Sequence, residues 1–219
     1  MSLFEDRAQA GRLLAKSLAS YASREDVVVL GLPRGGVPVA YEVAKALRAP
    51  MDVFIVRKLG APGHEELAMG AIASGGVRVL NPGVVRSLGI SEDVIDASAY
   101  RQHQELERRE TLYRRGRPAV ELKDKVVILV DDGMATGASM RAAVIGVKAH
   151  DPGKVIVAVP TAAAEACSTI GQMVDDEIRC AATPEPFYGV GYWYDDFHQT
   201  SDNEVASLLA EATDAERGE

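Results

Sequence analysis

The sequence has little cysteine, no long apolar run and no basic N-terminus, and each shortage excludes a class of protein. Its two cysteines, Cys167 and Cys180, are too few for a disulfide framework and lack the spacing of a zinc site. We therefore expect small buried side chains in a reducing cytoplasm. No apolar run approaches the roughly 18 residues of a membrane span. Acids stand in MSLFEDRAQ where a signal peptide needs a basic and then an apolar stretch. A soluble, cytoplasmic protein without a membrane partner is expected.

Positive charge is also scarce. The chain has 24 basic and 32 acidic residues, which gives a formal net charge of −8. Because a basic surface supplies the attraction to nucleic acids, no nucleic-acid partner is expected. Eight of the acids and a single arginine lie between residue 195 and the end of the chain. The acidity belongs mostly to this tail, so a local anion site elsewhere is compatible with it.

The chain has the composition and pattern of one α/β domain. Its 219 residues are 47% hydrophobic and 26% charged, the balance of a globular protein, with only 5% aromatic residues. After an amphipathic helix over residues 4–21, apolar runs of strand length alternate with helical patterns. Strands are expected at residues 27–30, 52–56, 126–130 and 155–159, and helices at about 39–47, 140–149 and after 159. Continuous apolar strands followed by helices predict a parallel sheet covered on both faces.

Three segments interrupt this alternation. Residues 58–83 are rich in glycine and small residues and include a short strand at 77–80. Residues 183–200 carry the only tryptophan among several phenylalanines and tyrosines, and a capping box over 201–204 begins the last helix. Residues 91–117 form a helix with sparse apolar positions, and its arginines crowd one end, namely Arg101, Arg108, Arg109, Arg114, Arg115 and Arg117.

The most informative stretch is VVILVDDGMATGASM, residues 126–140. An apolar strand ends in two acids, and a loop of small and hydroxyl residues leads into a helix. Open α/β sheets bind ligands at the carboxyl ends of their strands. Small residues let backbone N–H groups approach an anion, and the helix N-terminus adds partial positive charge. The pattern predicts a phosphate cradle that lacks the lysine of a P-loop; its residues are Ala135, Thr136, Gly137, Ala138 and Ser139.

Two acids, Asp131 and Asp132, precede this cradle. Carboxylates beside a phosphate imply another group between them, and the vicinal hydroxyls of a ribose, held directly or through Mg²⁺, meet that need. The acids and the cradle together indicate a ribose 5-phosphate site, with Asp131 and Asp132 as metal ligands. The alternative interpretation is that both acids are turn and N-cap residues, which are common at strand ends.

Residues 128–139, ILVDDGMATGAS, resemble the signature of type I phosphoribosyltransferases, whose substrate is 5-phosphoribosyl 1-diphosphate (PRPP). One position departs from it, since Gly133 stands where an aliphatic residue is usual. The resemblance covers about residues 27–200 and implies one phosphoribosyltransferase-like domain over the whole chain. It would be a parallel sheet flanked by helices, with a flexible lid at 59–76, a helical insertion at 84–117 and a small hood at 183–200.

The resemblance also implies a diphosphate site. GLPRGG follows the first strand, where the family binds the diphosphate. Arg34 would face that group, while Gly35 and Gly36 would offer backbone N–H groups, with an unusual cis peptide in the loop. Arg57 and Lys58 follow the second expected strand, where adenine-type members also carry basic residues. Taken alone, Arg34 has a less favoured alternative interpretation as a solvated loop arginine.

The hood resembles the nucleobase site of hypoxanthine-guanine phosphoribosyltransferases. By this resemblance Tyr188 would stack on a base, Val190 would give a backbone contact, and Asp195 would meet the base edge or a second Mg²⁺. An edge strand with packed aromatics is the alternative. The lysine that reads a 6-oxo group has no counterpart, and Ala135 stands where 6-oxopurine enzymes have an aspartate. A 6-oxopurine acceptor is therefore disfavoured.

Three polar residues of the expected lid, His64, Glu65 and Glu66, suggest a metal or acid–base site, but we favour exposed lid positions. A lid would close to keep water from an activated sugar.

The leading hypothesis is Mg²⁺-dependent transfer of phosphoribosyl from PRPP to a nucleobase or related nitrogen acceptor, with release of diphosphate and inversion at the anomeric carbon. Asp131 and Asp132, the catalytic pair, would hold the ribose hydroxyls. The cluster of Arg34, Arg57 and Lys58 would stabilise the leaving group. The alternative is a PRPP-binding regulator without transferase activity, whereas a receiver-like Mg²⁺ domain fits poorly. The family resemblance also implies a homodimer.

Overall fold

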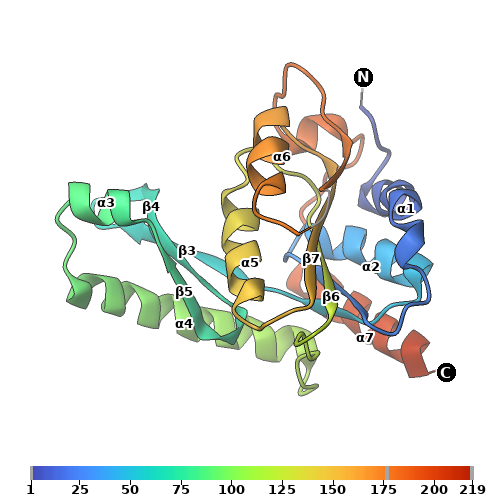
Figure 1. The fold of residues 1–219 in the computed structure, drawn as a ribbon, viewed down its shortest axis with the longest axis horizontal. Helices are drawn as coiled ribbons and strands as arrows, with labels where there is room; N and C mark the ends of the chain where they lie inside the picture. The colour runs from blue at the N-terminus through green and yellow to red at the C-terminus, as the bar shows by residue number, and fades with distance from the viewer. Residues whose placement is uncertain (1, 176–177, 218–219) are drawn as a thin grey trace.

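The computed structural model describes residues 2–175 and 178–217, in which a parallel sheet carries a projecting antiparallel arm (Figure 1). The parallel sheet has the strand order β2-β1-β6-β7-β8. Its strands are β1 (Val27–Gly31), β2 (Met51–Val53), β6 (Val126–Val130), β7 (Lys154–Thr161) and β8 (Arg179–Ala182). The arm contains an antiparallel sheet of β3 (Val56–Ala61), β4 (His64–Ala73) and β5 (Val77–Leu80).

Helices cover both faces of the parallel sheet, as Figure 1 shows on either side of β6 and β7. One face carries α1 (Arg7–Ser17), α2 (Gly36–Leu47) and α7 (Asp202–Arg217). The other carries α5 (Ala138–Lys148) and α6 (Ala164–Gly171). The predicted α/β class, a parallel sheet flanked by helices, is therefore confirmed.

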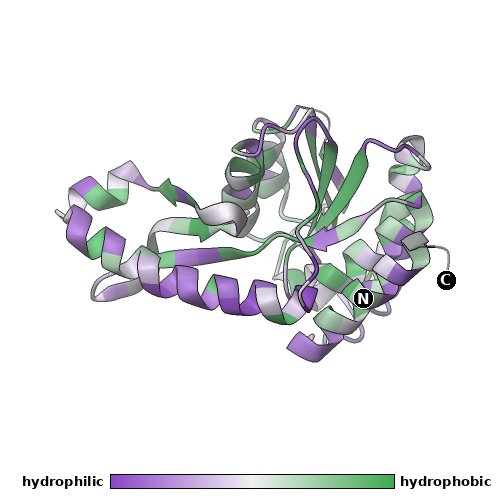
Figure 2. Cartoon of the chain, turned by 90° about the horizontal axis from the view of Figure 1, so that it is seen from below, coloured by the Kyte–Doolittle hydropathy of each residue, from purple (hydrophilic) through white to green (hydrophobic). Residues whose placement is uncertain are grey.

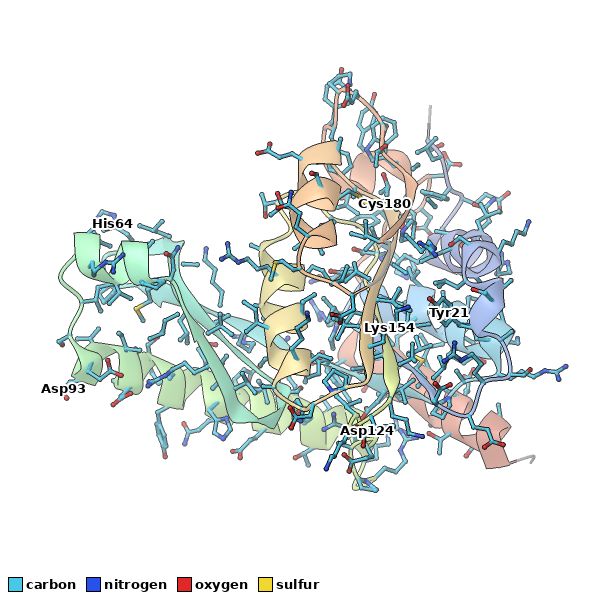
Figure 3. All side chains as sticks on the ribbon, in the orientation of Figure 1. Tyr21, His64, Asp93, Asp124, Lys154 and Cys180 are labelled. Carbon is cyan, nitrogen blue, oxygen red and sulfur yellow. A yellow bond between two sulfur atoms is a disulfide. The ribbon has the colours of Figure 1, made fainter. Side chains whose placement is uncertain are left out.

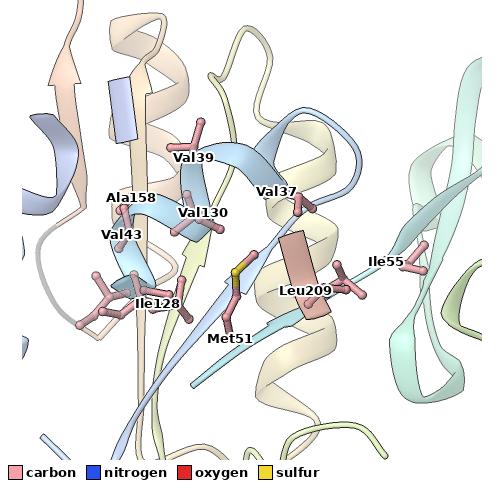
Figure 4. Packing of buried hydrophobic residues seen from close by; sticks show 14 of the residues in the cluster. Val37, Val39, Val43, Met51, Ile55, Ile128, Val130, Ala158 and Leu209 are labelled. Carbon is pink, nitrogen blue, oxygen red and sulfur yellow. The ribbon is translucent and has the colours of Figure 1, made fainter. Parts of the chain in front are cut away.

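The strands β1 and β6 are buried and apolar throughout because each of their faces meets a separate hydrophobic cluster. On β1, Val27 and Val29 belong to one cluster, while Val28 and Leu30 belong to the other. Figure 4 shows valines of α2 packed beside Ile128 of β6 in the first cluster. This double burial fixes the carboxyl ends of β1 and β6 side by side, where the candidate site lies.

The arm is completed by two helices, α3 (Pro82–Ser87) and α4 (Glu92–Arg114). Figure 2 shows much of α4 in hydrophilic colours, in contrast to the apolar central strands, and this matches its sparse apolar pattern. Tyr113 is fully buried near its end and donates a hydrogen bond to Asp202 Oδ1 over 2.7 Å. Arg114 forms a buried ion pair with Asp52. These contacts join the base of the arm to α7 and β2.

The expected strand at 52–56 is confirmed only for its first two residues in the parallel sheet. The parallel strand β2 ends at Val53, and the chain then enters the second sheet at Val56. Phe54 and Ile55 between them are buried, so the apolar run is continuous across a change of sheet. Hydrophobicity reports burial but does not distinguish one sheet from the next.

Residues 59–76, predicted as a lid, include the end of β3, all of β4 and a 3₁₀ turn at Ser74–Gly76. The segment is thus mostly an antiparallel hairpin, followed by the expected return strand β5. His64 is exposed at the far end of the arm (Figure 3), while the side chains of Glu65 and Glu66 lie outside the described residues. Closure of the hairpin over the site stays a prediction.

The cysteines differ from expectation. Cys167 on α6 and Cys180 on β8, predicted as separate apolar side chains, form a disulfide between Cα atoms 6.8 Å apart. The two residues meet because Cys180 packs against the hydrophobic cluster that contains Cys167, although β8 has no clear sequence pattern. Among residues 2–175 and 178–217, no helix has both the length and the apolarity to cross a membrane.

Candidate active site

The acid pair lies directly beneath the glycine loop that follows β1. Asp131 Oδ1 accepts a hydrogen bond from the Asp132 backbone N–H over 2.9 Å. A Cβ atom added at Gly36 would lie 2.8 Å from Asp131 Cα, and one added at Gly35 would lie 2.0 Å from Asp132 Oδ2. The preceding Pro33–Arg34 peptide is cis, as the family resemblance implied. The two glycines are required because the loop touches both acids.

Burial dominates the electrostatics of the pair. It raises the pKa of Asp131 well above its usual range, and the neighbouring charge of Asp132 raises it further. Burial also raises the pKa of Asp132, although the guanidinium of Arg7 opposes that effect. Tyr194 donates to the Asp132 carbonyl oxygen over 2.5 Å, and burial raises the pKa of this phenol. Hydroxyl donors or a cation would relieve the crowded negative charge.

The predicted phosphate cradle is an exposed loop at the start of α5. Gly137 has a φ of 72°, a left-handed conformation that glycine adopts readily, and it occupies the N-cap position. The Ala138 N–H lies 3.4 Å from Thr136 Oγ1. The exposed loop side chains are Ala135, Thr136, Ala138 and Ser139. Backbone N–H groups of the first helical turn lack partners within the helix, so this loop has the form of an anion site.

The basic residues are less convergent than predicted. Arg34 Nη1 lies 3.9 Å from Asp202 Oδ1, beside the glycine loop. Arg57 and Lys58 lie within β3, not in a loop after the second parallel strand. Arg57 donates from Nε to Gln102 on α4 over 2.9 Å, and Lys58 is exposed. These two residues were expected at the edge of the parallel sheet because the apolar run up to residue 56 was interpreted as a single parallel strand.

Arginines of α4 add to this basic region. Burial and then the nearby charge of Arg109 lower the pKa of Arg57, so the two guanidinium groups are neighbours. Hydrogen bonds from Arg108 and Arg109 lower the pKa of Glu105 to about 2. Arg34 and Arg109 both act electrostatically on buried Tyr113. Basic groups from the glycine loop, β3 and α4 therefore gather around the base of the arm.

The hood is an irregular segment with a 3₁₀ helix at Val190–Trp193, not an edge strand. Tyr188 and Tyr192 are 67% and 56% exposed, with ring centroids 4.9 Å apart. Asp195 accepts a hydrogen bond from Ser2 Oγ over 2.5 Å, so the N-terminal segment holds it. The segment presents a pair of accessible aromatic rings.

Packing of the hood explains the unusual glycine of the signature. A Cβ atom at Gly133 would lie 2.4 Å from Val190 Cγ1 and 2.9 Å from its Cγ2. Val190 therefore occupies the space that an aliphatic side chain would fill at position 133. The departure is a local exchange of apolar volume between the loop and the hood.

Sequence reasoning missed Arg7, which reaches the acid pair from α1. Its Nε lies 2.8 Å from Asp132 Oδ2, and its Nη1 donates to the His198 carbonyl over 2.8 Å. Its guanidinium carbon lies 3.9 Å from the centroid of the Phe197 ring. A signal was present, because this arginine belongs to the buried stripe of the helix; the stripe consists of Arg7, Ala10, Gly11, Leu14 and Ala15.

A family model of the phosphoribosyl transferase domain matches residues 4–168, which include the acid pair, the cradle and the glycine loop. The chain belongs to the phosphoribosyl transferase domain family. This phosphoribosyl transferase domain is 49% identical over 212 residues to two Mycobacterium tuberculosis proteins, named "Putative phosphoribosyl transferase Rv0571c" and, in another strain, MT0597. The match covers 97% of the chain but 47% of each relative, so the chain spans about half the length of these curated relatives.

A solved structure supports the fold of the phosphoribosyl transferase domain over nearly its full length. The crystal structure of TT1426 from Thermus thermophilus is 44% identical in sequence and has a TM-score of 0.84. The match covers 96% of this chain and 99% of TT1426. The arm and the hood therefore fall within the compared region along with the parallel sheet.

The donors at the acid pair suit a lightly coordinated metal. The part of the chain that the structure describes has no group of three or more His, Cys, Asp or Glu residues arranged for a metal ion. Asp131 and Asp132 supply two adjacent carboxylates. Mg²⁺ is commonly held by one or two carboxylates with substrate and water oxygens in its other positions, so the pair fits this ion.

Proposed function

We propose that the domain transfers the phosphoribosyl group of PRPP to a nitrogen acceptor and releases diphosphate, with Mg²⁺ as cofactor. The observation that supports this proposal most strongly is the close contact of Gly35 with Asp132 and of Gly36 with Asp131. It brings a diphosphate loop, a ribose site and the phosphate cradle of α5 together at the ends of two paired strands. Each portion of PRPP then has a chemically matched neighbour.

The acid pair has two oxygens available for the ribose hydroxyls. Asp131 Oδ1 accepts the Asp132 N–H, and Asp132 Oδ2 accepts from Arg7. Among the described residues, no hydrogen bond reaches the second oxygen of either carboxylate. Two oriented acceptors on adjacent residues match a vicinal diol, because each hydroxyl can donate one charge-assisted hydrogen bond.

Bond breaking would be driven by stabilisation of the leaving group. The bond from the anomeric carbon to oxygen breaks, its electron pair leaves with the diphosphate, and the acceptor nitrogen forms the new bond from the opposite face. Mg²⁺, when bound, supplies positive charge to the diphosphate. The backbone N–H of Gly35 and the charge of Arg34 stabilise the same group. The Gly36 N–H, which the family resemblance also assigned to the diphosphate, instead donates to the Leu32 carbonyl over 3.0 Å. The acid pair favours positive charge developing on the ring.

The hood suits a planar acceptor. Tyr188 and Tyr192 offer exposed ring faces on which a heteroaromatic ring can stack. Ala135 offers no carboxylate to a ring nitrogen, which argues against a 6-oxopurine acceptor. Ser2 engages only the Oδ1 atom of Asp195, so contact with a base edge would fall to the other carboxylate oxygen.

A regulatory role without chemistry would need a surface for another macromolecule, and the arginine-rich helix is a weak candidate. Four of the six arginines between residues 101 and 117 already bond within the chain, namely Arg108, Arg109 and Arg114 of α4, and Arg117 beyond the end of that helix. This internal pairing favours the transferase. The homodimer and the cytoplasmic location expected from the sequence stay predictions.

The proposal is tested by incubating the protein with PRPP, Mg²⁺ and a panel of nucleobases and other nitrogen heterocycles, while ³¹P NMR follows diphosphate. The wild-type protein should release diphosphate with at least one acceptor, and Asp132→Asn should abolish release while circular dichroism stays unchanged. PRPP that binds but stays intact with every acceptor would favour the regulator. Full activity of Asp132→Asn would overturn the assignment of the acid pair.

A further inference from the structure

The N-terminal segment is bound to the hood along its backbone. The Leu3 N–H donates to the Trp193 carbonyl over 2.8 Å, and the Asp195 N–H donates to the Phe4 carbonyl over 2.9 Å. Figure 1 shows the N-terminus and the hood at the same end of the sheet. Immediately after these contacts, α1 begins at Arg7. Residues 3–7 therefore run in a defined conformation from the hood to the acid pair.

Arg7 lies where the acid pair, the glycine loop and the hood meet. Beyond its contact with Asp132, its Nε is 3.2 Å from the position that a Cβ atom at Gly35 would occupy. The Nη1 atom of Arg7 donates to the His198 carbonyl, and the flat face of the guanidinium covers the ring of Phe197. Only 8% of the residue is exposed. These contacts hold the guanidinium in one orientation.

We propose that Arg7 is a positioning residue that orients the Asp132 carboxylate toward the hydroxyls of ribose, an inference that rests on the proposed function. By engaging Oδ2, Arg7 fixes the rotation of the carboxylate and leaves Oδ1 to accept from the sugar. The hood contributes indirectly, because His198 and Phe197 keep the guanidinium in place.

Lysine cannot reproduce this arrangement. An ammonium at position 7 keeps the charge, but it has neither the planar fork that spans Asp132 and His198 nor a flat face for Phe197. Arg12 provides a matched control on the same helix, since its side chain is 54% exposed and its Nη1 lies 3.4 Å from Glu42. Substitution there removes an arginine without touching the acid pair.

The test measures the binding of ribose 5-phosphate and of inorganic phosphate to the full chain, without Mg²⁺, by calorimetry or ³¹P NMR. Inorganic phosphate can occupy the cradle but carries no sugar hydroxyls. Loss of an oriented charge-assisted hydrogen bond should weaken ribose 5-phosphate binding about tenfold or more in Arg7→Gln. Phosphate binding should fall far less. Arg7→Lys should retain phosphate binding and recover only part of the sugar affinity, and Arg12→Gln should match the wild type in both.

Several results would overturn the inference. Wild-type affinity for ribose 5-phosphate in Arg7→Gln or Arg7→Lys would show that the sugar does not depend on Arg7. Equal losses for ribose 5-phosphate and phosphate would assign Arg7 a purely structural or long-range electrostatic role. If Arg7→Gln does not fold, Arg7→Lys decides between these outcomes. A wild-type protein that binds no ribose 5-phosphate would instead contradict the proposed function, and the inference with it.

Discussion

At the residue scale, the candidate site concentrates negative charge where water is scarce. Asp131 is the more affected member of the pair, because burial and the charge of Asp132 both raise its pKa. A native pKa above the ordinary value means that the folded protein binds the proton more tightly than the unfolded chain. Ionised Asp131 therefore destabilises the fold above its native pKa, and this cost disappears as the pH falls toward the ordinary value.

Asp131→Asn should consequently stabilise the protein at neutral pH. Asparagine can still accept the Asp132 N–H through its Oδ1 atom, so the local geometry is preserved. Each unit by which burial displaces the pKa corresponds to about 1.4 kcal/mol in the free energy of unfolding. Urea unfolding with EDTA present should show a gain at pH 7 that vanishes near pH 4. A variant less stable than wild type at pH 7 would argue against a costly buried charge.

Gly35→Ala should damage the site through a single added methyl group. The new Cβ atom would overlap the Asp132 carboxylate, so the loop or the acid must move. We expect a loss of about 1–3 kcal/mol in stability, as for overpacking elsewhere, and at least about tenfold weaker PRPP binding. Gly83→Ala is the control, because its Cβ would have 3.4 Å to its nearest neighbour, Asn81 Oδ1. Unchanged PRPP binding in Gly35→Ala would exclude the close approach described above.

The residues that sequence reasoning identified are those within one continuous motif. Asp131, Thr136 and Gly137 follow one another at the end of a buried strand, where local order alone implies a ligand site. Arg7 lies more than a hundred residues away, and only the packing of α1 brings it to Asp132. A single sequence does not reveal such a contact. An arginine on the apolar stripe of a helix does indicate that the side chain is buried against a polar partner.

At the element scale, the loop between β6 and α5 packs against the hood. Val190 fills the space above Gly133, so the two segments cannot change independently. The loop follows β6, which pairs with β7, and an isolated bridge between Met134 and Ala162 continues this pairing beside the hood. An exchange of volume between loop and hood should therefore be tolerated only when both partners change.

Gly133→Ala alone should destabilise the protein by about 1–3 kcal/mol, because its Cβ would collide with both methyl groups of Val190. Val190→Ala removes those methyl groups, and the double variant should recover about 1 kcal/mol or more relative to the sum of the single changes. Thermal or urea unfolding of the four proteins gives this coupling. Strict additivity would contradict direct packing between the two residues.

Several elements were predictable because they contain strong local signals. The capping box is an example, since Ser201 Oγ accepts the Glu204 N–H and Glu204 Oε2 accepts the Ser201 N–H. The end of β2 was not predictable, because buried Phe54 and Ile55 continue the apolar run into the arm. The short strand β8 also lacked a signal, as its four residues alternate only weakly.

At the scale of the whole molecule, the distribution of charge is compatible with the proposed binding of a polyanion by an acidic chain. Arginines of the glycine loop, β3 and α4 gather near the base of the arm, while acids dominate the C-terminal tail. The arm is anchored to the body by Tyr113 and Arg114, so its basic residues keep a defined position beside the parallel sheet. Local potential, not net charge, then governs the affinity for a diphosphate.

The central claim is that the acid pair and the glycine loop form one binding site for PRPP. Its most direct test is a calorimetric titration of the wild-type protein and of Asp132→Asn with PRPP and Mg²⁺. We expect saturable binding of one PRPP per chain to the wild type. Affinity should be at least about tenfold lower in Asp132→Asn, because a charged hydrogen-bonding group is lost. Equal affinity of the two folded proteins, or no binding to the wild type, would contradict it.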